Sequence, residues 1–313
     1  MLRYLFKRLL LVVLALAATN FGAFAYAHLA RSGVGNPYFA EARRANPLFS
    51  AYGDYFTQFF GGEGVASVRY GNEFLAVMAQ ATGASLVLLA LALVISVVLG
   101  YTLGLAGVRK SPPGIRNWLI ALSTLGLATP SFFIGSLAVA GILAATIWGP
   151  FETRPLPIQG YGLDTHLVLP VLVLCVRPVA QIAHYVAALT AGELGKPYVT
   201  AARGKGLTWE RATRHHALRN VYAPLIQVVS RTLRLIVGEL ILVEWLFGWP
   251  GLGFLLAETL IPGRMTGSSV EGRFLDPPLV ATVLTILAAF FLLLDTAAAV
   301  AVRRLDPRQR GSH

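Results

Sequence analysis

The chain has 313 residues, of which 56% are hydrophobic and 13% are charged, and its mean hydropathy is +0.64. About 25% charged residues is usual for a soluble globular chain, so this composition argues against a soluble protein. It also excludes intrinsic disorder, which needs low hydrophobicity and high charge. Cys175 is the only cysteine, which excludes an intrachain disulfide and a multi-thiolate metal site. The apolar excess indicates a polytopic membrane protein.

Six segments are predicted to cross the membrane as helices, because each offers about 20 predominantly apolar residues. In chain order they are residues 9–30, 74–108, 117–151, 167–192, 225–247 and 277–302. The first segment also resembles a secretory signal peptide, since Lys7 and Arg8 precede the apolar run and Ala23-Phe24-Ala25 supplies a cleavage site. Five later spans favour an uncleaved first helix, because both termini then come out on one side of the membrane.

The distribution of charge predicts the orientation of these spans. With both termini inside, the inside segments carry most of the 26 Lys and Arg residues and the outside segments carry most of the 15 acidic ones, as the positive-inside rule requires. The net charge of +11 therefore needs no nucleic-acid partner, because the basic segments face anionic headgroups of the lipid bilayer. The chain is accordingly divided into a first transmembrane helix (1–30), an extracytoplasmic segment (31–80), a five-helix core (81–305) and a cytoplasmic tail (306–313).

The extracytoplasmic segment is rich in aromatic residues, many of them between positions 48 and 60. Aromatic side chains favour the membrane–water interface. The segment therefore predicts a short amphipathic helix that lies on the membrane surface, and an aromatic ligand site is the alternative interpretation.

The inside loop 193–224 is the most informative stretch of the sequence. It reads as two short basic helices, in which Gly206 is placed to end the first with a left-handed backbone and Thr208 is placed to cap the second. A rigid helix–turn–helix of this kind is a natural docking element for another protein. A solvated basic loop bound to lipid headgroups is the alternative.

Motifs for chemistry are not found. The Gly-Lys pairs at 195–196 and 204–205 are not followed by Ser or Thr, so the chain has no phosphate-binding P-loop. It also lacks an HExxH zinc motif and a GxSxG nucleophile elbow. The sequence thus predicts no catalytic residue and no metal site.

Motifs in five regions together resemble the permease subunits of bacterial ABC importers, in the dipeptide/oligopeptide/nickel branch. Thr200-Ala201-Ala202, followed by Gly206 at the right spacing, resembles the EAA loop of these subunits, with Thr in place of the motif's Glu. The matching segments are Tyr198–Leu207 and His216–Asn220 in the loop, Gly126–Phe132, His166–Pro170, Glu244 with Phe247–Gly253, and the end of the chain, with Asp295 and Leu305–Arg308.

The resemblance implies an all-α type I importer permease of six transmembrane helices with both termini cytoplasmic, in the bacterial inner membrane. It also implies a second homologous permease subunit, one or two cytoplasmic ATPase subunits that bind the ATP and Mg²⁺, and an extracytoplasmic substrate-binding protein. This chain would hold no cofactor and would not be an enzyme. Peptides are the expected substrate, with nickel chelates and sugar oligomers left open. The alternative from another class is a polytopic membrane enzyme, such as an intramembrane protease or lipid transferase.

The EAA loop of such permeases transmits the motion of the ATPase as alternating access. Ala201 and Ala202 are expected to allow close approach of a partner, Trp209 to be a buried anchor, and the basic residues to steer association. The predicted coupling residues are Thr200, Ala201, Ala202, Arg203, Lys205, Gly206, Leu207, Trp209, Arg211, His216, Leu218, Arg219 and Asn220.

Six charged residues fall within predicted spans: Arg177, Arg231, Arg234, Glu239, Glu244 and Asp295. A charge at the bilayer centre costs about 2.5–3.5 kcal/mol on insertion scales, so such residues usually face protein or water. Three interpretations stay open: interhelical ion pairs, contacts with a carboxylate-bearing substrate in the pathway, and snorkelling to the interface, which best suits Arg231. Roughly ten extra residues near 263–272 have no assigned role.

Overall fold

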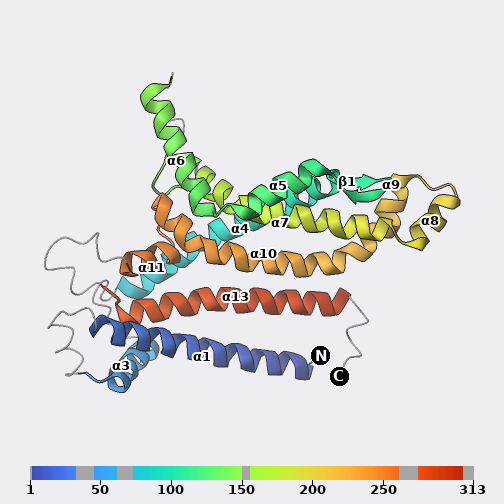
Figure 1. The fold of residues 1–313 in the computed structure, drawn as a ribbon. Coiled ribbons are helices and arrows are strands. Elements are labelled where there is room, and N and C mark those ends of the chain that lie inside the picture. The colour runs from blue at the N-terminus through green and yellow to red at the C-terminus, as the bar shows by residue number, and fades with distance from the viewer. Residues whose placement is uncertain (1, 33–45, 62–72, 150–155, 261–273, 306–313) are drawn as a thin grey trace. The chain divides into compact units, whose positions relative to one another are not determined.

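The structure is a computed structural model that describes residues 2–32, 46–61, 73–149, 156–260 and 274–305. Most of this part of the chain is helical (Figure 1). The tail 306–313, the extra residues near 263–272, and residues 33–45 and 62–72 of the predicted extracytoplasmic segment lie outside the described residues.

The helices of the described residues agree with the predicted membrane fold. Five are long and apolar enough to cross a bilayer, and a sixth span results if a helix pair bent by 73° is counted as one. The five are Phe6–Arg31 of α1 (Leu2–Ser32), α4 (Phe74–Ala106), α6 (Ser131–Trp148), Thr165–Leu194, which ends with α7 (Val168–Leu194), and Pro277–Val300 of α13 (Pro277–Leu305). The bent pair joins Trp209–Phe247, which ends with α10 (Leu218–Phe247), to α11 (Leu252–Leu260).

The predicted third span is divided into two helices. A 12-residue helix, α5 (Asn117–Ala128), ends before Pro130, and α6 begins at Ser131. Proline disfavours a helical backbone in the residue before it, and Thr129 is extended, with φ −92° and ψ 125°. The single span predicted over 117–151 is therefore wrong in its continuity, because α5 alone is too short to cross a bilayer.

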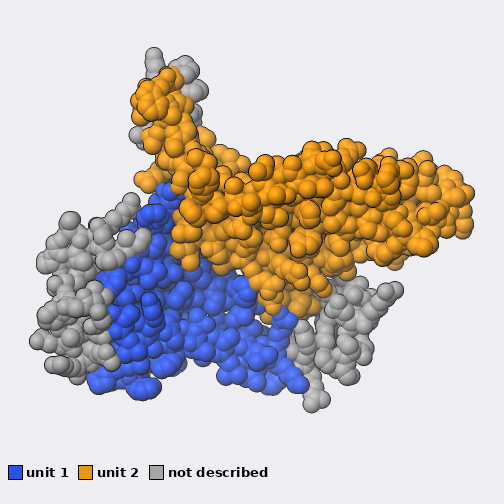
Figure 2. Space-filling view, viewed as in Figure 1, with its two compact units in different colours: residues 1–87, 244–293 blue, residues 88–243, 294–313 orange. Residues whose placement is uncertain are grey.

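The chain forms two compact units, coloured separately in Figure 2. Unit 1 comprises Met1–Val87 and Glu244–Leu293, and unit 2 comprises Leu88–Val243 and Leu294–His313. In unit 1, a helix is present where the sequence predicts one near 48–60: it is α3 (Leu48–Gly61), and it packs on α1. Asn20 of α1 donates hydrogen bonds to Tyr55 of α3 at 3.1 Å and to Thr285 of α13 at 3.0 Å, so one amide joins three helices.

Unit 2 is built around α7, with α5 lying along it (Figure 1). Where α4 crosses α7, a Cβ added at Gly100 would come within 2.6 Å of the Ile182 Cβ, and one at Gly104 within 2.6 Å of the Val186 Cβ. Glycines four residues apart are the small residues that let two membrane helices approach closely. The crossing distance is therefore set by the absence of side chains at these two positions.

Short elements complete the end of unit 2 at which α7 ends and α10 begins. A hairpin of β1 (Val108–Lys110) and β2 (Pro113–Ile115) follows α4. Beyond α7 come α8 (Pro197–Gly204), α9 (Trp209–Ala212) and a π-helical turn, η3 (Thr213–Ala217), which leads directly into α10. The predicted loop 193–224 is thus largely helical, and its ends belong to α7 and α10.

Candidate functional site: the elbow and the charges within the helices

The segment between α7 and α10, residues 195–217, is called the elbow here. Its first helix ends as the sequence predicts. Gly206 has φ +87°, its N–H donates to the Arg203 carbonyl at 2.9 Å, and the Leu207 N–H donates to the Ala202 carbonyl at 3.3 Å. These two bonds form a Schellman motif, which needs a left-handed residue at the position of Gly206. The backbone conformation predicted for Gly206 is confirmed.

The second helix of the elbow begins as predicted but does not end as a separate element. The Thr208 hydroxyl accepts a hydrogen bond from the Arg211 N–H at 3.3 Å, so Thr208 is the N-cap of α9. After four residues α9 continues through η3 into α10. A displacement of α9 can therefore reach α10 through continuous helical backbone.

The inner face of the elbow is packed. Its buried residues Val199, Ala212 and Ala217 join one apolar cluster with Leu194 and Leu119 of the neighbouring helices. The packing fixes both short helices to α7, because the burial of apolar side chains favours one arrangement. The elbow is consequently part of the folded unit and is not a floppy linker.

Trp209, predicted as an anchor for a partner, packs against this cluster of its own chain. The Arg203 guanidinium lies over its ring, 4.7 Å from the centroid, and donates a hydrogen bond to the Leu207 carbonyl at 2.6 Å. Ring and guanidinium stabilise each other by a cation–π interaction. Part of the Trp209 surface is thus used within the elbow itself.

The outer face of the elbow is exposed and basic. Most of the predicted coupling residues lie there, while Ala202 and Leu207 are half-buried and Leu218 is buried. The exposed ones in the elbow are Thr200, Ala201, Arg203, Lys205, Gly206, Arg211 and His216, and Arg219 and Asn220 are exposed at the start of α10. The residues are brought to one end of unit 2, where the side chains of Lys205 and Arg211 are exposed.

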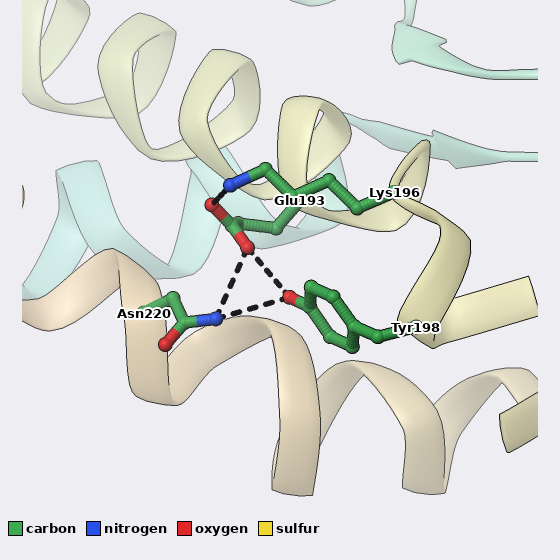
Figure 3. Close-up of polar contacts among 4 residues, drawn as sticks. All are labelled: Glu193, Lys196, Tyr198 and Asn220. Atoms are coloured by element: carbon green, nitrogen blue, oxygen red, sulfur yellow. Dashed lines mark hydrogen bonds and ion pairs between the residues drawn. The ribbon is translucent and has the colours of Figure 1, made fainter. Parts of the chain in front are cut away.

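A carboxylate not predicted from the sequence joins the base of the elbow to both long helices (Figure 3). Glu193, near the end of α7, accepts hydrogen bonds from the Tyr198 hydroxyl of α8 at 2.5 Å and from the Asn220 amide of α10 at 3.2 Å, and it forms an ion pair with Lys196. The Asn220 amide also donates to the Tyr198 oxygen at 3.1 Å. We call these four residues the Glu193 clasp.

Partial burial and the hydrogen bond to Glu193 raise the pKa of the Tyr198 hydroxyl above its ordinary value. The hydroxyl therefore keeps its proton and remains a donor at neutral pH. The clasp brings together side chains up to 27 positions apart, and no periodicity in the sequence indicates it.

Four of the six charges within the predicted spans lie in two pairs inside unit 2. Arg177 of α7 forms an ion pair with Glu239 of α10, and Arg234 of α10 lies 3.5 Å from Asp295 of α13. Arg231 is exposed and has no ion pair among the described residues. Within the described part of the chain, Arg177 Nε and Glu239 Oε2 are buried without a hydrogen-bond partner, so this pair leaves one donor and one acceptor unsatisfied.

Glu244 caps a helix, a role that is not predicted from the sequence. Its buried carboxylate accepts hydrogen bonds from the Ser85 hydroxyl at 2.6 Å and from the N–H groups of Gly253 at 2.7 Å and Phe254 at 3.3 Å. The Ser85 oxygen accepts the Leu252 N–H at 2.8 Å. A carboxylate in this position satisfies free amides at the N-terminus of α11 and interacts favourably with the helix dipole.

The bend between α10 and α11 accounts for the glycines in Phe247–Gly253. Gly248 has φ +62° and ends α10 with the same pair of backbone bonds that ends α8. A Cβ at Gly251 would collide with the Glu244 carboxylate. The Trp249 indole N–H donates to the Ala84 carbonyl at 3.0 Å, which ties the bend to α4 within unit 1.

The family profile described as "Binding-protein-dependent transport system inner membrane component" matches residues 96–311. The dipeptide transport system permease protein of Lactococcus lactis subsp. cremoris is 28% identical over 268 residues, covering 84% of this chain and 81% of the relative. An oligopeptide transport system permease protein of Mycobacterium bovis is 26% identical over an alignment of 340 positions that covers 100% of both chains. An oligopeptide permease of Bacillus subtilis is 25% identical over 63% of each chain. With its apolar helices and a family match over most of its length, the chain belongs to the binding-protein-dependent transport system inner membrane components, and it is a multi-pass permease subunit of an ABC importer in the bacterial inner membrane.

Proposed function

We propose that this permease subunit forms half of a pathway for di- or oligopeptides and is driven by an ATPase that docks on the elbow. A second homologous permease forms the other half, and one or two cytoplasmic ATPase subunits bind the ATP and Mg²⁺. An extracytoplasmic binding protein delivers the substrate. Both termini of the chain lie in the cytoplasm, and the chain supplies no catalytic residue of its own.

The observation that carries the docking proposal is the contrast between the two faces of the elbow. The inner face is packed against α7, whereas the outer face presents Lys205, Arg211 and other polar groups to solvent. Exposed basic groups around a rigid element favour fast, oriented association with a complementary surface. The Glu193 clasp would then pass a displacement of α8 to the end of α7 and the start of α10 together.

Peptide specificity rests on a separate observation. Relatives that match this chain over most of their length include a dipeptide permease and an oligopeptide permease. Uptake of a radiolabelled dipeptide by the reconstituted complex tests this part. Uptake of a nickel chelate or an oligosaccharide, without uptake of the peptide, would contradict the proposed substrate and leave the proposed architecture of the importer unchanged.

The docking proposal is tested by purifying the chain from its native host in a gentle detergent and identifying the bound proteins by mass spectrometry. We expect a second permease and one or two ATPases with the wild-type chain. Lys205→Glu with Arg211→Glu should lose the ATPases and keep the second permease. The matched control, Arg109→Glu with Lys110→Glu on the β1–β2 hairpin, makes the same change of charge at exposed residues outside the elbow.

Two results would contradict the docking proposal. One is full recovery of the ATPases with the elbow variant, and the other is recovery of the wild-type chain alone, folded and monodisperse. A loss of ATPase from the hairpin control as well would assign the binding to general basic charge, and the elbow would then have no special role.

A further inference from the structure

The surface of α3 is divided into three faces, because successive residues of an α-helix are turned by about 100°. One face packs on α1 through Tyr52 and Tyr55. A second carries three phenylalanines, Phe49, Phe56 and Phe60, whose side chains are 78%, 49% and 71% exposed. The third is polar and is formed by Ser50, Asp54 and Thr57, all of them exposed.

We propose that α3 is an interfacial helix whose phenylalanine edge (Phe49, Phe56 and Phe60) lies among lipid acyl chains while its polar edge (Ser50, Asp54 and Thr57) faces water. An amphipathic helix in this position lies parallel to the membrane plane with its apolar side in the boundary between headgroups and acyl chains. The proposal concerns unit 1 alone and is independent of ATPase docking and of the substrate.

The orientation of α3 about its own axis is fixed by the packed face. Tyr52 meets the ring of Phe21 edge-on at 5.1 Å between centroids, and Tyr55 stacks on Phe24 at 5.3 Å. The Tyr52 hydroxyl donates to the Asn20 side-chain oxygen at 3.0 Å. Rotation of α3 would break these contacts, so the phenylalanine edge cannot turn away from its direction without loss of the α1–α3 interface.

The helix on which α3 rests indicates what covers the phenylalanine edge. Within unit 1, α1 contains a membrane span and exposes large apolar side chains at many positions, among them Leu11 at 65% and Tyr26 at 61%. Such a surface on a membrane span faces lipid tails. The contacts of α3 involve Asn20, Phe21 and Phe24 in the second half of this span, so α3 lies toward the end of the span that is nearer to Arg31.

The chemistry of α3 favours insertion by aromatic side chains over electrostatic attraction. Its sequence from Leu48 to Gly61 contains no Lys or Arg, and Asp54 is its single charged residue. Basic residues are what draw a surface helix to anionic lipid, whereas Phe side chains gain from leaving water. We therefore expect the same insertion in zwitterionic and in anionic bilayers.

Spin labels on single cysteines test the proposal. The only native cysteine, Cys175, is buried, so Cys175→Ala gives a background for labelling the full chain in nanodiscs of phosphatidylcholine, with or without phosphatidylglycerol. Phe56→Cys and Thr57→Cys are adjacent exposed positions on different edges. At position 56 the label should collide more with oxygen than with a water-soluble nickel chelate, and at position 57 the ratio should be reversed, in both lipid compositions.

Two outcomes would overturn the proposal. High accessibility to the nickel chelate at both positions would place α3 in water, and low accessibility to both reagents at position 56 would mean that protein covers the phenylalanine edge. Photo-crosslinking of the unsubstituted chain tests the same proposal if a labelled variant fails to fold. A photoactivatable phosphatidylcholine should form adducts on Phe49, Phe56 or Phe60, and adducts confined to the polar edge would contradict the insertion.

Discussion

Glycine is needed at Gly206 for its backbone and not for its size. A Cβ at this position would meet no atom within 4 Å, yet φ is +87°. The left-handed region costs an L-residue roughly 1–2 kcal/mol, and Asn pays less of this cost than Ala. At Gly204, two residues earlier, a Cβ would also meet no atom within 4 Å, but this residue belongs to α8 and has no positive φ. A comparison of substitutions at the two glycines therefore distinguishes backbone strain from steric effects.

Gly206→Ala is expected to loosen the end of α8, because the strain weakens the Schellman bonds. Amide exchange at Leu207, followed by mass spectrometry, should become about tenfold faster, the factor that corresponds to roughly 1.4 kcal/mol. Gly206→Asn should lie between wild type and Gly206→Ala, and Gly204→Ala should exchange at the wild-type rate or more slowly. Equal behaviour of the two alanine variants would contradict the assignment of strain to Gly206.

Glu244→Gln is expected to destabilise the bend between α10 and α11. The carboxylate accepts three hydrogen bonds while buried, and an amide side chain puts an NH₂ donor where an acceptor is needed. An unsatisfied buried group costs about 1–3 kcal/mol, so the Tm of the purified protein should fall. Glu210→Gln, at an exposed carboxylate 3.9 Å from Arg214, should leave the Tm unchanged because exposed ion pairs contribute little.

At the scale of the element, the α4–α7 crossing depends on small residues. Gly104→Ala would put a Cβ within 2.6 Å of the Val186 Cβ, and overpacking of this kind typically costs about 1–3 kcal/mol. Gly83→Ala, in the same helix, meets nothing within 4 Å and should be neutral or stabilising. Thermal unfolding in detergent distinguishes the two, and an unchanged Tm for Gly104→Ala would show that the helices can separate at no cost.

The Arg177–Glu239 pair joins α7 to α10 where most neighbouring positions are apolar. Arg177→Leu should destabilise the protein by about 3 kcal/mol, because it leaves a largely buried carboxylate without its counter-charge. The reversed pair, Arg177→Glu with Glu239→Arg, should regain most of the loss. If the reversed pair is as unstable as Arg177→Leu, the loss of the counter-charge does not explain the destabilisation.

At the scale of the whole molecule, the charge distribution predicts a fixed orientation in the membrane. A cysteine at Lys205 should react with a membrane-impermeant maleimide only from the cytoplasm, and one at Asp54 only from outside, in a Cys175→Ala background. Both native residues are exposed, so neither substitution should affect folding. Labelling of both positions from the same side would overturn the topology predicted for the chain between residues 54 and 205.

The features that follow from local chemistry are those the sequence predicts. The apolar length of the spans, the left-handed glycine at Gly206 and the cap at Thr208 each depend on a few neighbouring residues. Proline limits the residue before it, so Pro130 is a local signal for the break between α5 and α6, but the length of the apolar run predicts a single span. By contrast, Ser85 and Glu244 are 159 positions apart, and only the packing of α4 against the bend brings them together.

The same limit applies to the candidate site. The outer residues of the elbow are named by their resemblance to the EAA loop, while the Glu193 clasp depends on how α7, α8 and α10 converge (Figure 3). Ion pairing within the spans was one of three interpretations, because a helical wheel gives the direction of a charge but not the helix that meets it. Tertiary contacts determine which charges pair, and these contacts cannot be derived from a single sequence.

A π-helical turn differs from the surrounding α-helix by one inserted residue. In η3 that residue shifts the phase between α9 and α10 by about 100° relative to an uninterrupted helix. If all five residues of this turn, Thr213–Ala217, were α-helical, the elbow's side chains would swing around the axis of α10 by roughly that angle, whereas deletion of His215, an exposed residue of the turn, would leave them in place. The π-helical turn thus sets the angle at which the exposed face of the elbow is held relative to α10.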